Sequence, residues 1–305
     1  MKCPTLSELP PPPHGKTGWP WTEETPFHTG EPNTKECRIS IISPSYNTVR
    51  FLEETIRSVL LQGYTDLEYI IIDGGSTDGS LEIIKKYEKW ITCWISEPDS
   101  GYADAVNKGF IRATGDIRAW LPVSDRYAPG ALQMANRYLG RRQNDLIFGR
   151  VCSLSEDGQV GELRPLVAKK LSHISLYGRS NPCQPATFWR REIHKKTGEL
   201  NTNLRYAADS EWFLRLSFEG RCRGIPEMVC YLRKHQGQLS SNLQIMIDEW
   251  YVAWNEIVRQ RGISRLKILL VSMWVVPVMR YRAGGVRTLI RIPRLQSLKR
   301  MFGKT

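Results

Sequence analysis

The 305-residue sequence lacks the patterns that define several common protein classes. It has neither a G-x-x-x-x-G-K-[ST] nor a G-x-G-x-x-G motif, which argues against a P-loop enzyme and an ordinary dehydrogenase. Its seven cysteines are scattered without a C-x-x-C pair, so we expect reduced, buried thiols rather than a disulfide framework or a zinc site. No apolar stretch typical of a secretory signal occurs near the N-terminus, and we therefore expect a cytoplasmic protein.

Acidic residues are absent after Glu256, which concentrates the positive charge in the last part of the chain. The sequence holds 43 Lys and Arg against 31 Asp and Glu, a net charge of +12. Twelve of the basic residues follow Glu256, so the body is neutral. Apolar residues between 286 and 302 fall near helical spacing among these cations. This pattern favours a basic amphipathic helix on an anionic membrane surface, although an apolar face packed on the body is the alternative.

A long apolar run is also lacking. The apolar stretch at 268–279 has 12 residues and contains Pro277, whereas a bilayer span needs about 20. We therefore expect peripheral association with the inner face of the membrane rather than insertion. Because no recognition fold or aromatic-basic interleaving accompanies the charge, nucleic acid is not expected as a partner.

Three parts of the chain differ in composition. Residues 1–37 are rich in proline and tryptophan, which predicts an extended arm laid over the body, with a polyproline ligand as the alternative. Residues 38–240 form the predicted main domain, and residues 241–305 form a helical basic extension.

The stretch LEYIIIDGGSTDGS at 67–80 carries the clearest local pattern. Apolar residues without alternation run into Asp73 and predict a strand buried on both faces, which Gly74 and Gly75 end. Further strands are expected at 39–43, 92–96 and 117–121, with helices over 52–60, 81–87 and 103–113. Strands and helices that alternate with short connections predict an α/β fold with a parallel sheet and right-handed crossovers.

Polar residues follow the C-terminal end of each predicted strand. They are Tyr46 with Asn47, Asp73, Asp99 and Asp125. Because the carboxyl ends of parallel strands share one edge of a sheet, we expect these groups to converge on a ligand site. Any single one of them could be a turn residue, since Asp and Asn favour turns, but four in succession favour a site.

Several motifs in order resemble family 2 glycosyltransferases of the GT-A fold. They are SIISPSYN at 40–47, FLEETIRSVLLQGY at 51–64, IIIDGGSTDGS at 70–80, SEPDSGYADAVNKG at 96–109 and ATGDIRAWL at 113–121. The resemblance covers roughly residues 38–240. It implies a nucleotide-sugar half at 38–125, an acceptor half at 126–240, and sugar transfer with inversion from a UDP-, dTDP- or GDP-linked donor. It also implies Mg²⁺ or Mn²⁺ as the usual cofactor.

The same resemblance assigns a donor pocket. Asp73 would accept a hydrogen bond from the base or ribose, Tyr46 would pack on the base, and Asp99 would close the pocket. The full set of donor-binding candidates is Ser43, Pro44, Ser45, Tyr46, Asp73, Asp99 and Ser124.

The metal motif of the family, commonly Asn-Ser-Asp-Asp, aligns with PVSD at 122–125. Only its final residue is kept, which makes Asp125 the expected ligand. His235 lies where relatives often carry a His near the metal or diphosphate, and Arg233 or Lys234 beside it could contact the diphosphate. A divalent ion would stabilise the charge of the leaving diphosphate, and it needs few protein ligands because it also binds water and phosphate.

Asp209, in AADSEWFLRL at 207–216, matches the catalytic base of the family. An inverting displacement needs a carboxylate opposite the leaving group to take the proton of the acceptor hydroxyl. The alternative for Asp209 is a helix N-cap. PCQPATF at 182–188 resembles the family's segment beside the acceptor pocket.

The sequence therefore predicts a metal-dependent, inverting glycosyltransferase in surface polysaccharide or glycan biosynthesis, with a saccharide or lipid-linked acceptor. The alternative is a catalytically weakened relative that binds nucleotide sugars or glycans, because the metal motif is reduced to Ser124-Asp125. A nucleotidyltransferase would need a basic Gly-rich loop after the first strand, and SPSYN at 43–47 is not such a loop.

Overall fold

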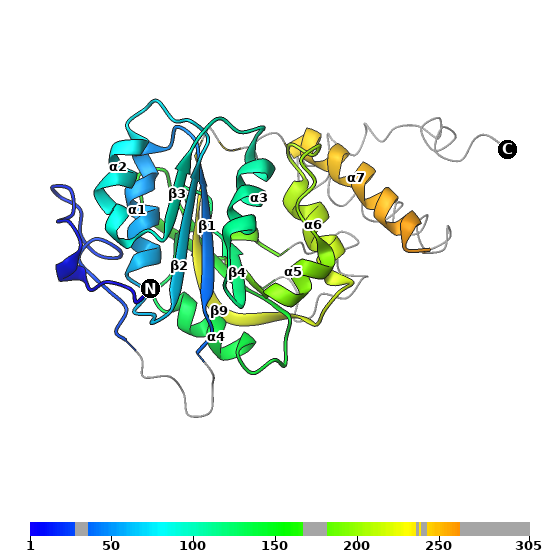
Figure 1. Ribbon diagram of the computed structural model, residues 1–305, viewed down its shortest axis with the longest axis horizontal. Coiled ribbons are helices and arrows are strands. Elements are labelled where there is room, and N and C mark those ends of the chain that lie inside the picture. Colours follow the sequence, from blue (N-terminus) through cyan, green and yellow to red (C-terminus); the bar gives the residue numbers. More distant parts are fainter. Residues whose placement is uncertain (28–35, 167–181, 236–237, 239–242, 263–305) are drawn as a thin grey trace.

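The computed structural model describes residues 1–27, 36–166, 182–235, 238 and 243–262. In these ranges one nine-stranded sheet has the order β3-β2-β1-β4-β8-β6-β9-β5, with β7 paired to β6. Figure 1 shows helices on both sides of this sheet. The predicted α/β fold, with a sheet flanked by helices, is therefore confirmed.

The N-terminal half of the sheet is parallel, as the sequence pattern predicts. Its strands are β1 (Ile39–Ser45), β2 (Leu67–Asp73), β3 (Cys93–Ser96) and β4 (Ile117–Trp120). β1 pairs in parallel with β2 and β4, and β2 pairs in parallel with β3. Because Asp73 lies opposite Ser45 on one side and Ser96 on the other, three strands end at the same level.

β1 is longer than predicted, because it continues through Pro44 to Ser45. The Leu121 N–H donates to the Ile42 carbonyl, so the polar backbone atoms of Ile42 face the β4 side. Because backbone direction alternates along a strand, those of Pro44, two residues later, face the same side. β4 pairs with β1 only as far as Ile42. The missing N–H of Pro44 therefore leaves no ladder bond unmade.

The C-terminal half makes the sheet mixed. Its strands are β5 (Arg126–Tyr127), β6 (Leu146–Leu154), β7 (Val160–Leu163), β8 (Thr187–Arg190) and β9 (Cys222–Arg233). β8 is antiparallel to β4 and β6, whereas the long strands β6 and β9 are parallel to each other. β9 ends at Arg233, which brings the last residues of the sheet beside Asp125 and β5.

Helices cover both faces of the sheet. They are α1 (Val49–Leu60), α2 (Ser80–Tyr87), α3 (Tyr102–Arg112), α4 (Ala131–Leu139), α5 (Arg191–Thr197), α6 (Ala208–Ser217) and α7 (Leu243–Gln260). Figure 1 shows α1 and α2 on one side of the parallel strands and α3 on the other, with α6 and α7 beyond α3. None of the helices in the described ranges has the length and apolar character needed to cross a membrane.

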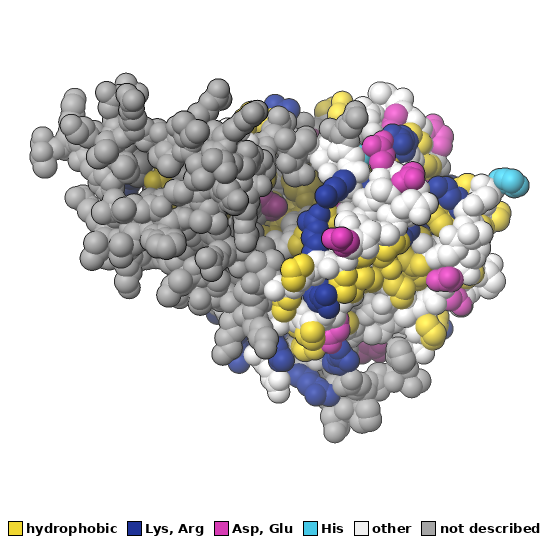
Figure 2. All heavy atoms as spheres, turned by 180° about the vertical axis from the view of Figure 1, so that it is seen from behind, with side chains coloured by type: hydrophobic (Ala, Val, Ile, Leu, Met, Phe, Trp, Pro, Cys, Tyr) yellow, Lys and Arg dark blue, Asp and Glu magenta, His cyan; other side chains and the backbone are white. Residues whose placement is uncertain are grey.

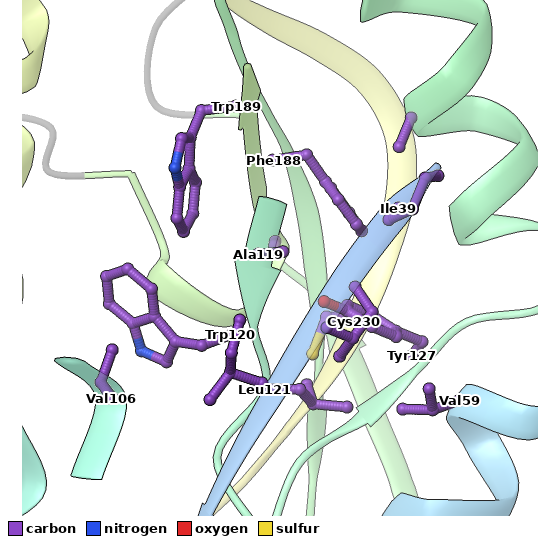
Figure 3. Packing of buried hydrophobic residues seen from close by; sticks show 14 of the residues in the cluster. Ile39, Val59, Val106, Ala119, Trp120, Leu121, Tyr127, Phe188, Trp189 and Cys230 are labelled. Atoms are coloured by element: carbon purple, nitrogen blue, oxygen red, sulfur yellow. The ribbon is translucent and has the colours of Figure 1, made fainter. Parts of the chain in front are cut away.

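An aromatic cluster ties α6 to the sheet. The ring of Trp120 in β4 lies 5.1 Å from that of Trp189 in β8, which lies 4.9 Å from that of Trp212 in α6. Phe213 stacks on Trp120 with a centroid distance of 5.6 Å. Figure 3 shows Trp120 and Trp189 close together in the buried core. Large aromatic side chains in contact stabilise a core strongly, so the body of α6 is held in place by this cluster.

The N-terminal residues pack on α1 through a buried arginine. Arg57, which has no exposed side-chain surface, donates hydrogen bonds to the backbone carbonyls of Pro10, Pro20 and Trp21. Trp19 is buried as well, and its indole N–H donates to the carbonyl of Tyr127 in β5 at 2.8 Å. The proline-rich stretch is therefore joined to the core in this structure.

Charge on the described surface is mixed in sign. Figure 2 shows acidic and basic side chains interspersed around hydrophobic ones on the face seen from behind. The basic residues expected on a membrane-facing helix belong to 263–305, which lie outside the described residues.

Candidate functional site

An exposed aromatic ring, a glycine and a carboxylate meet where β1, β2 and β3 end. Tyr46 directly follows β1, and 63% of its surface is exposed. A Cβ atom added to Gly74 would lie 2.6 Å from Asp99 Oδ2 and 3.3 Å from Tyr46 Cδ2. Such a close approach is open to glycine alone. The three residues thus form one surface that offers a ring for stacking and oxygens that accept hydrogen bonds.

Asp73 lies beneath this surface and is fully buried. Its Oδ2 accepts from the backbone N–H groups of Gly75 and Ser76 and from the Ser96 hydroxyl at 2.8 to 3.1 Å. Its Oδ1 accepts from the Ser76 hydroxyl at 2.5 Å. A buried carboxylate with four internal donors is satisfied by its own loop. The geometry thus gives Asp73 the task of shaping the glycine loop.

The remaining candidates in β1 are buried as well. Ser43 accepts a hydrogen bond from the Tyr69 hydroxyl at 3.2 Å, and the Ser45 and Thr48 hydroxyls lie 2.9 Å apart. Pro44 is buried between them. Of the stretch from Ser43 to Tyr46, only Tyr46 is therefore exposed to a ligand.

Asn47 locks the loop after β1 to the loop after β2. It has a left-handed backbone with φ of 49°, a conformation that Asn adopts more readily than most residues. Its N–H donates to Ser76 Oγ at 2.8 Å, and its Oδ1 accepts from the Thr77 N–H at 2.9 Å. Two of the strand ends are thereby held as one unit.

Asp125 follows β4 and is only 3% exposed. Its Oδ1 accepts from the Arg233 backbone N–H at 2.8 Å, while its Oδ2 has no hydrogen-bond partner among the described residues. Its backbone carbonyl accepts from Thr55 Oγ1 at 2.7 Å. Burial raises the pKa of Asp125 to about 7, although the hydrogen bond and charge of Arg233 act in the opposite direction.

A buried charge network surrounds Asp125. The Arg233 guanidinium donates to the carbonyls of Ser124, Ser155 and Glu156 at 2.8 to 3.1 Å and to Glu54 Oε2 at 2.6 Å. The other oxygen of Glu54 accepts from Arg126. All three charged residues are buried. Because these bonds engage every nitrogen of the Arg233 guanidinium, its geometry is that of a structural group rather than of a diphosphate contact.

The described residues contain no group of three or more His, Cys, Asp or Glu that could hold a metal ion. His235 instead packs against Phe51, with ring centroids 5.1 Å apart, and burial lowers its pKa. Asp125 Oδ2 is the one oxygen that the motif retains for an ion. Mg²⁺ and Mn²⁺ accept few protein ligands when diphosphate and water complete their shell. The donor set therefore fits an ion held jointly by Asp125 and a bound diphosphate.

Asp209 is the second residue of α6. The N-cap residue of this helix is Ala207, so the alternative prediction that Asp209 is the N-cap is wrong. Asp209 Oδ1 accepts from the Ser210 backbone N–H at 2.6 Å. Burial raises the pKa of Asp209, which brings a carboxylate closer to the range of a general base.

Tyr102 relates the two carboxylates to each other. Burial raises its pKa, and the negative charges of Asp209 and then Asp125 raise it further. Burial raises the pKa of Cys183 to about 12, and the charges of the same two carboxylates contribute to this rise. Charges act on a buried group strongly only at short range. The charges of Asp125 and Asp209, which come from separate halves of the chain, thus both reach the same phenol and the same thiol.

Hydrogen bonds fix the floor of this region. The Trp120 indole N–H donates to the Tyr102 hydroxyl at 2.5 Å, and that hydroxyl donates to Gln184 Oε1 at 3.3 Å. The Gln184 amide in turn donates to the Trp120 carbonyl at 2.6 Å. Tyr102 and Gln184 both lie within the sequence motifs, but no role was predicted for either of them. The sequence signal that could have indicated Tyr102 is its place as an aromatic residue at the start of a helix, directly after Ser100-Gly101.

Comparisons of the sequence with known proteins agree on one family. The profile described as Glycosyl transferase family 2 matches residues 40–208. A PGL/p-HBAD biosynthesis glycosyltransferase of Mycobacterium bovis BCG is 30% identical over 268 residues, which cover 82% of this chain and 95% of that protein. An uncharacterized glycosyltransferase of Nostoc is 29% identical over 212 residues. In that pair the match covers 65% of this chain and 65% of the relative, less than two thirds of its length.

Solved structures share the fold. TarS of S. aureus, residues 1–349 in complex with UDP-GlcNAc, has a TM-score of 0.60 at 17% identity, covering 87% of this chain and 72% of that one. The mannosyltransferase PcManGT from Pyrobaculum calidifontis, in complex with GDP-Man and Mn²⁺, has a TM-score of 0.59 at 16% identity. That match covers 95% of this chain and 80% of PcManGT. The fold is that of GT-A enzymes, as the sequence motifs predict.

Proposed function

The chain belongs to glycosyltransferase family 2, and we propose that it transfers a sugar, with inversion, from a nucleoside diphosphate sugar to an acceptor hydroxyl. The observation that carries this proposal is the pair of carboxylates, Asp125 and Asp209, whose charges both reach the half-buried phenol of Tyr102 that Trp120 and Gln184 hold in place. One of them follows the nucleotide-binding strands and the other begins a helix of the second half. An inverting transfer needs two such groups, one on the diphosphate side and one on the acceptor side.

The donor's nucleoside would lie on the surface formed by Tyr46, Gly74 and Asp99. The ring of Tyr46 is exposed and can stack on a base, while Asp99 can accept hydrogen bonds from base or ribose. Asp73 would act indirectly, by holding the glycine loop in shape. TarS was solved with UDP-GlcNAc and PcManGT with GDP-Man, which supports a nucleotide-sugar donor without choosing its base.

The diphosphate would lie beside Ser124 and Asp125. When a divalent cation is bound there, it stabilises the charge that develops on the leaving nucleoside diphosphate. Asp125 Oδ2 would bind that ion, while the Arg233 backbone N–H holds the other oxygen in place. Ser124 is buried against the same arginine and would line the pocket.

Asp209 would act as the general base. As the acceptor oxygen forms its bond to the anomeric carbon, the bond from that carbon to the diphosphate oxygen breaks. The acceptor proton passes to the Asp209 carboxylate, and the nucleoside diphosphate leaves with the bonding electron pair. Attack opposite the leaving group inverts the anomeric centre.

The acceptor and location are proposed on other grounds. The match to a PGL/p-HBAD biosynthesis glycosyltransferase supports a role in glycan biosynthesis, with a saccharide or lipid-linked acceptor. The twelve basic residues after Glu256 support peripheral binding to an anionic membrane, as on the inner face of a cytoplasmic membrane.

The proposal is tested by screening UDP-, dTDP- and GDP-linked sugars by thermal shift with and without Mn²⁺, followed by transfer assays with the donor that binds. A bound donor stabilises the folded protein by mass action, by about 2.7 kcal/mol at a donor concentration one hundred times Kd, and this raises the melting temperature. Transfer that depends on the cation is the expected result. Donor binding without any turnover would instead favour a weakened, binding-only relative.

A further inference from the structure

Three consecutive backbone N–H groups converge on a single carboxylate just before α6. Glu249 Oε2 accepts from Tyr206 at 2.7 Å and from Ala207 at 3.0 Å, and Glu249 Oε1 accepts from Arg205 at 3.2 Å. Glu249 belongs to α7, more than 40 residues later in the chain. Both oxygens of one side chain are thus used to hold the turn that leads into the helix of Asp209.

The start of α6 needs such a partner. Its N-cap, Ala207, has no side-chain oxygen, and no side-chain cap hydrogen bond is formed. N–H groups at the start of a helix have no partner within the helix, and a negative charge placed there is favourable. Glu249 accepts from the N–H of the N-cap residue Ala207 and of the two residues before it, and it brings a negative charge to this end of the helix.

Other contacts hold the rest of α6 independently of Glu249. The Trp212 indole N–H donates to the Gly198 carbonyl at 2.7 Å, and Arg215 donates to the carbonyls of Thr197 and Glu199 at 2.5 and 2.7 Å. Trp212 also belongs to the aromatic core. Loss of the Glu249 contacts would therefore release the entry turn without detaching the helix.

Helix α7 is a firm support for this contact. Its buried side chains are Ile247, Trp250, Trp254, Ile257 and Val258. Glu249 lies between the first two of them, so its Cα is held by packing on either side. The carboxylate can thus transmit a fixed position to the turn at 205–207.

We propose that Glu249 is a positioning residue for the Asp209 base, acting through the backbone at 205–207. The inference rests on the proposed function, since it assigns Glu249 to the same reaction. Asp209 lies two residues after the last amide that Glu249 binds, so a shift of that turn moves the carboxylate relative to the acceptor. Donor binding depends on other residues and is left unchanged.

Glu249→Gln removes one acceptor oxygen and replaces it with an amide NH₂ that faces backbone donors. We expect kcat to fall by about tenfold to a hundredfold, since a displacement of about 1 Å in a reacting group has effects of this size. The KM of the donor and the Kd of the unreactive nucleoside diphosphate should stay within about twofold of wild type, since no donor-pocket contact changes. A contact that merely stabilised the fold would not produce this selective loss of kcat.

Glu256→Gln is the matched control. Glu256 lies on α7 seven residues after Glu249, and among the described residues its carboxylate bonds to Arg259 and Gln260 of the same helix. The kcat of Glu256→Gln should equal that of wild type. Should Glu249→Gln fail to fold, Glu249→Asp carries the test, because it keeps the charge and shortens the reach by one methylene.

The experiment measures kcat, donor KM and nucleotide Kd for wild type, both Glu249 variants, Glu256→Gln and Asp209→Asn. A selective loss of kcat in a folded Glu249 variant supports the positioning role. An unchanged kcat, or a parallel loss of kcat, donor affinity and thermal stability, overturns it. If Asp209→Asn retains full activity, the proposed base itself fails. If Asp209→Asn loses activity while the Glu249 variants turn over at the wild-type rate, the proposed function stands and the inference falls.

Discussion

The two carboxylates that act on Tyr102 are held by different kinds of structure. Asp125 is nearly inaccessible and lies in a buried network in which Glu54 bridges Arg126 and Arg233. Asp209 is only partly buried, accepts a hydrogen bond from the backbone N–H of the next residue, and follows a turn that Glu249 of α7 holds. The donor side is therefore built into the core, whereas the acceptor side is placed on its surface.

This difference separates stability from chemistry. Breaking a buried charge network leaves an uncompensated charge and destabilises the fold. Changing a partly exposed carboxylate disturbs little packing, so its main effect should appear in the rate. We therefore expect substitutions on the donor side to lower the free energy of unfolding and those on the acceptor side to lower kcat.

The largest effect is expected for Asp209→Asn. Loss of a general base typically lowers the rate by about 10² to 10⁴, while donor binding is retained because the donor surface belongs to β1, β2 and β3. Single-turnover transfer and nucleotide titration measure the two quantities separately. A variant that turns over at the wild-type rate would remove Asp209 from the base role.

The next effect is on stability. Glu54→Gln removes the charge between Arg126 and Arg233, and breaking a buried ion pair in this way destabilises by about 3 to 5 kcal/mol. Urea unfolding measures this loss. Glu53→Gln on the same helix is the control. Glu53 pairs with the exposed Lys86, and such surface pairs contribute about 0 to 1 kcal/mol, while the amide oxygen of glutamine can still accept from the Tyr87 hydroxyl. Equal effects of the two substitutions would contradict the contrast between core and surface.

A smaller effect is expected at the donor surface. In Gly74→Ala, the new methyl group would lie 2.6 Å from Asp99 Oδ2, so one of the two residues must move. We expect the donor Kd to rise by about tenfold, equivalent to about 1.4 kcal/mol, with little change in kcat. Isothermal titration with the nucleoside diphosphate measures this.

A double-mutant cycle sharpens the same prediction. If the methyl group acts through Asp99, then Gly74→Ala combined with Asp99→Ala should bind the donor no more weakly than Asp99→Ala alone. Strictly additive losses would show that Gly74 acts on the donor by another route.

The parallel half was predictable from the sequence because its signals are local. The apolar run before Asp73 specifies a strand buried on both faces, and Gly74 with Gly75 ends it. The end of β1 was misjudged at Pro44, since the effect of a missing N–H depends on which neighbouring strand it faces. The roles of the individual site residues, Asp125 and Asp209 among them, stay predictions.

The supporting residues were not predictable, because their partners are remote in the chain. Arg233 or Lys234 was considered as a diphosphate contact, yet the Arg233 guanidinium binds Glu54, 179 positions away. Glu249 is one acidic residue among several on an amphipathic helix, and nothing in its local pattern indicates that it binds the turn at 205–207. Local patterns specify elements, whereas such contacts are decided only when the elements pack together.

The smallest effect is expected in the pH dependence of the acceptor side. Burial raises the pKa of Asp209 above the ordinary value of about 3.9 for Asp. A general base acts only when deprotonated, so kcat/KM should be high above this raised pKa and fall as pH decreases through it. A pH–rate profile of wild type should show this acid limb at a higher pH than an exposed Asp would give.

The same raised pKa also affects the free energy of unfolding. A carboxylate in an ion pair stabilises the fold when it is charged, whereas Asp209 is expected to do the opposite. A group whose pKa is higher in the folded state binds its proton more tightly there, so its charged form destabilises the fold at neutral pH. Asp209→Asn should therefore melt at a slightly higher temperature than wild type at pH 8. The difference should shrink as pH falls through the raised pKa, where wild type becomes neutral as well. A variant that melts below wild type at pH 8 would show that the Asp209 carboxylate is part of the structural support.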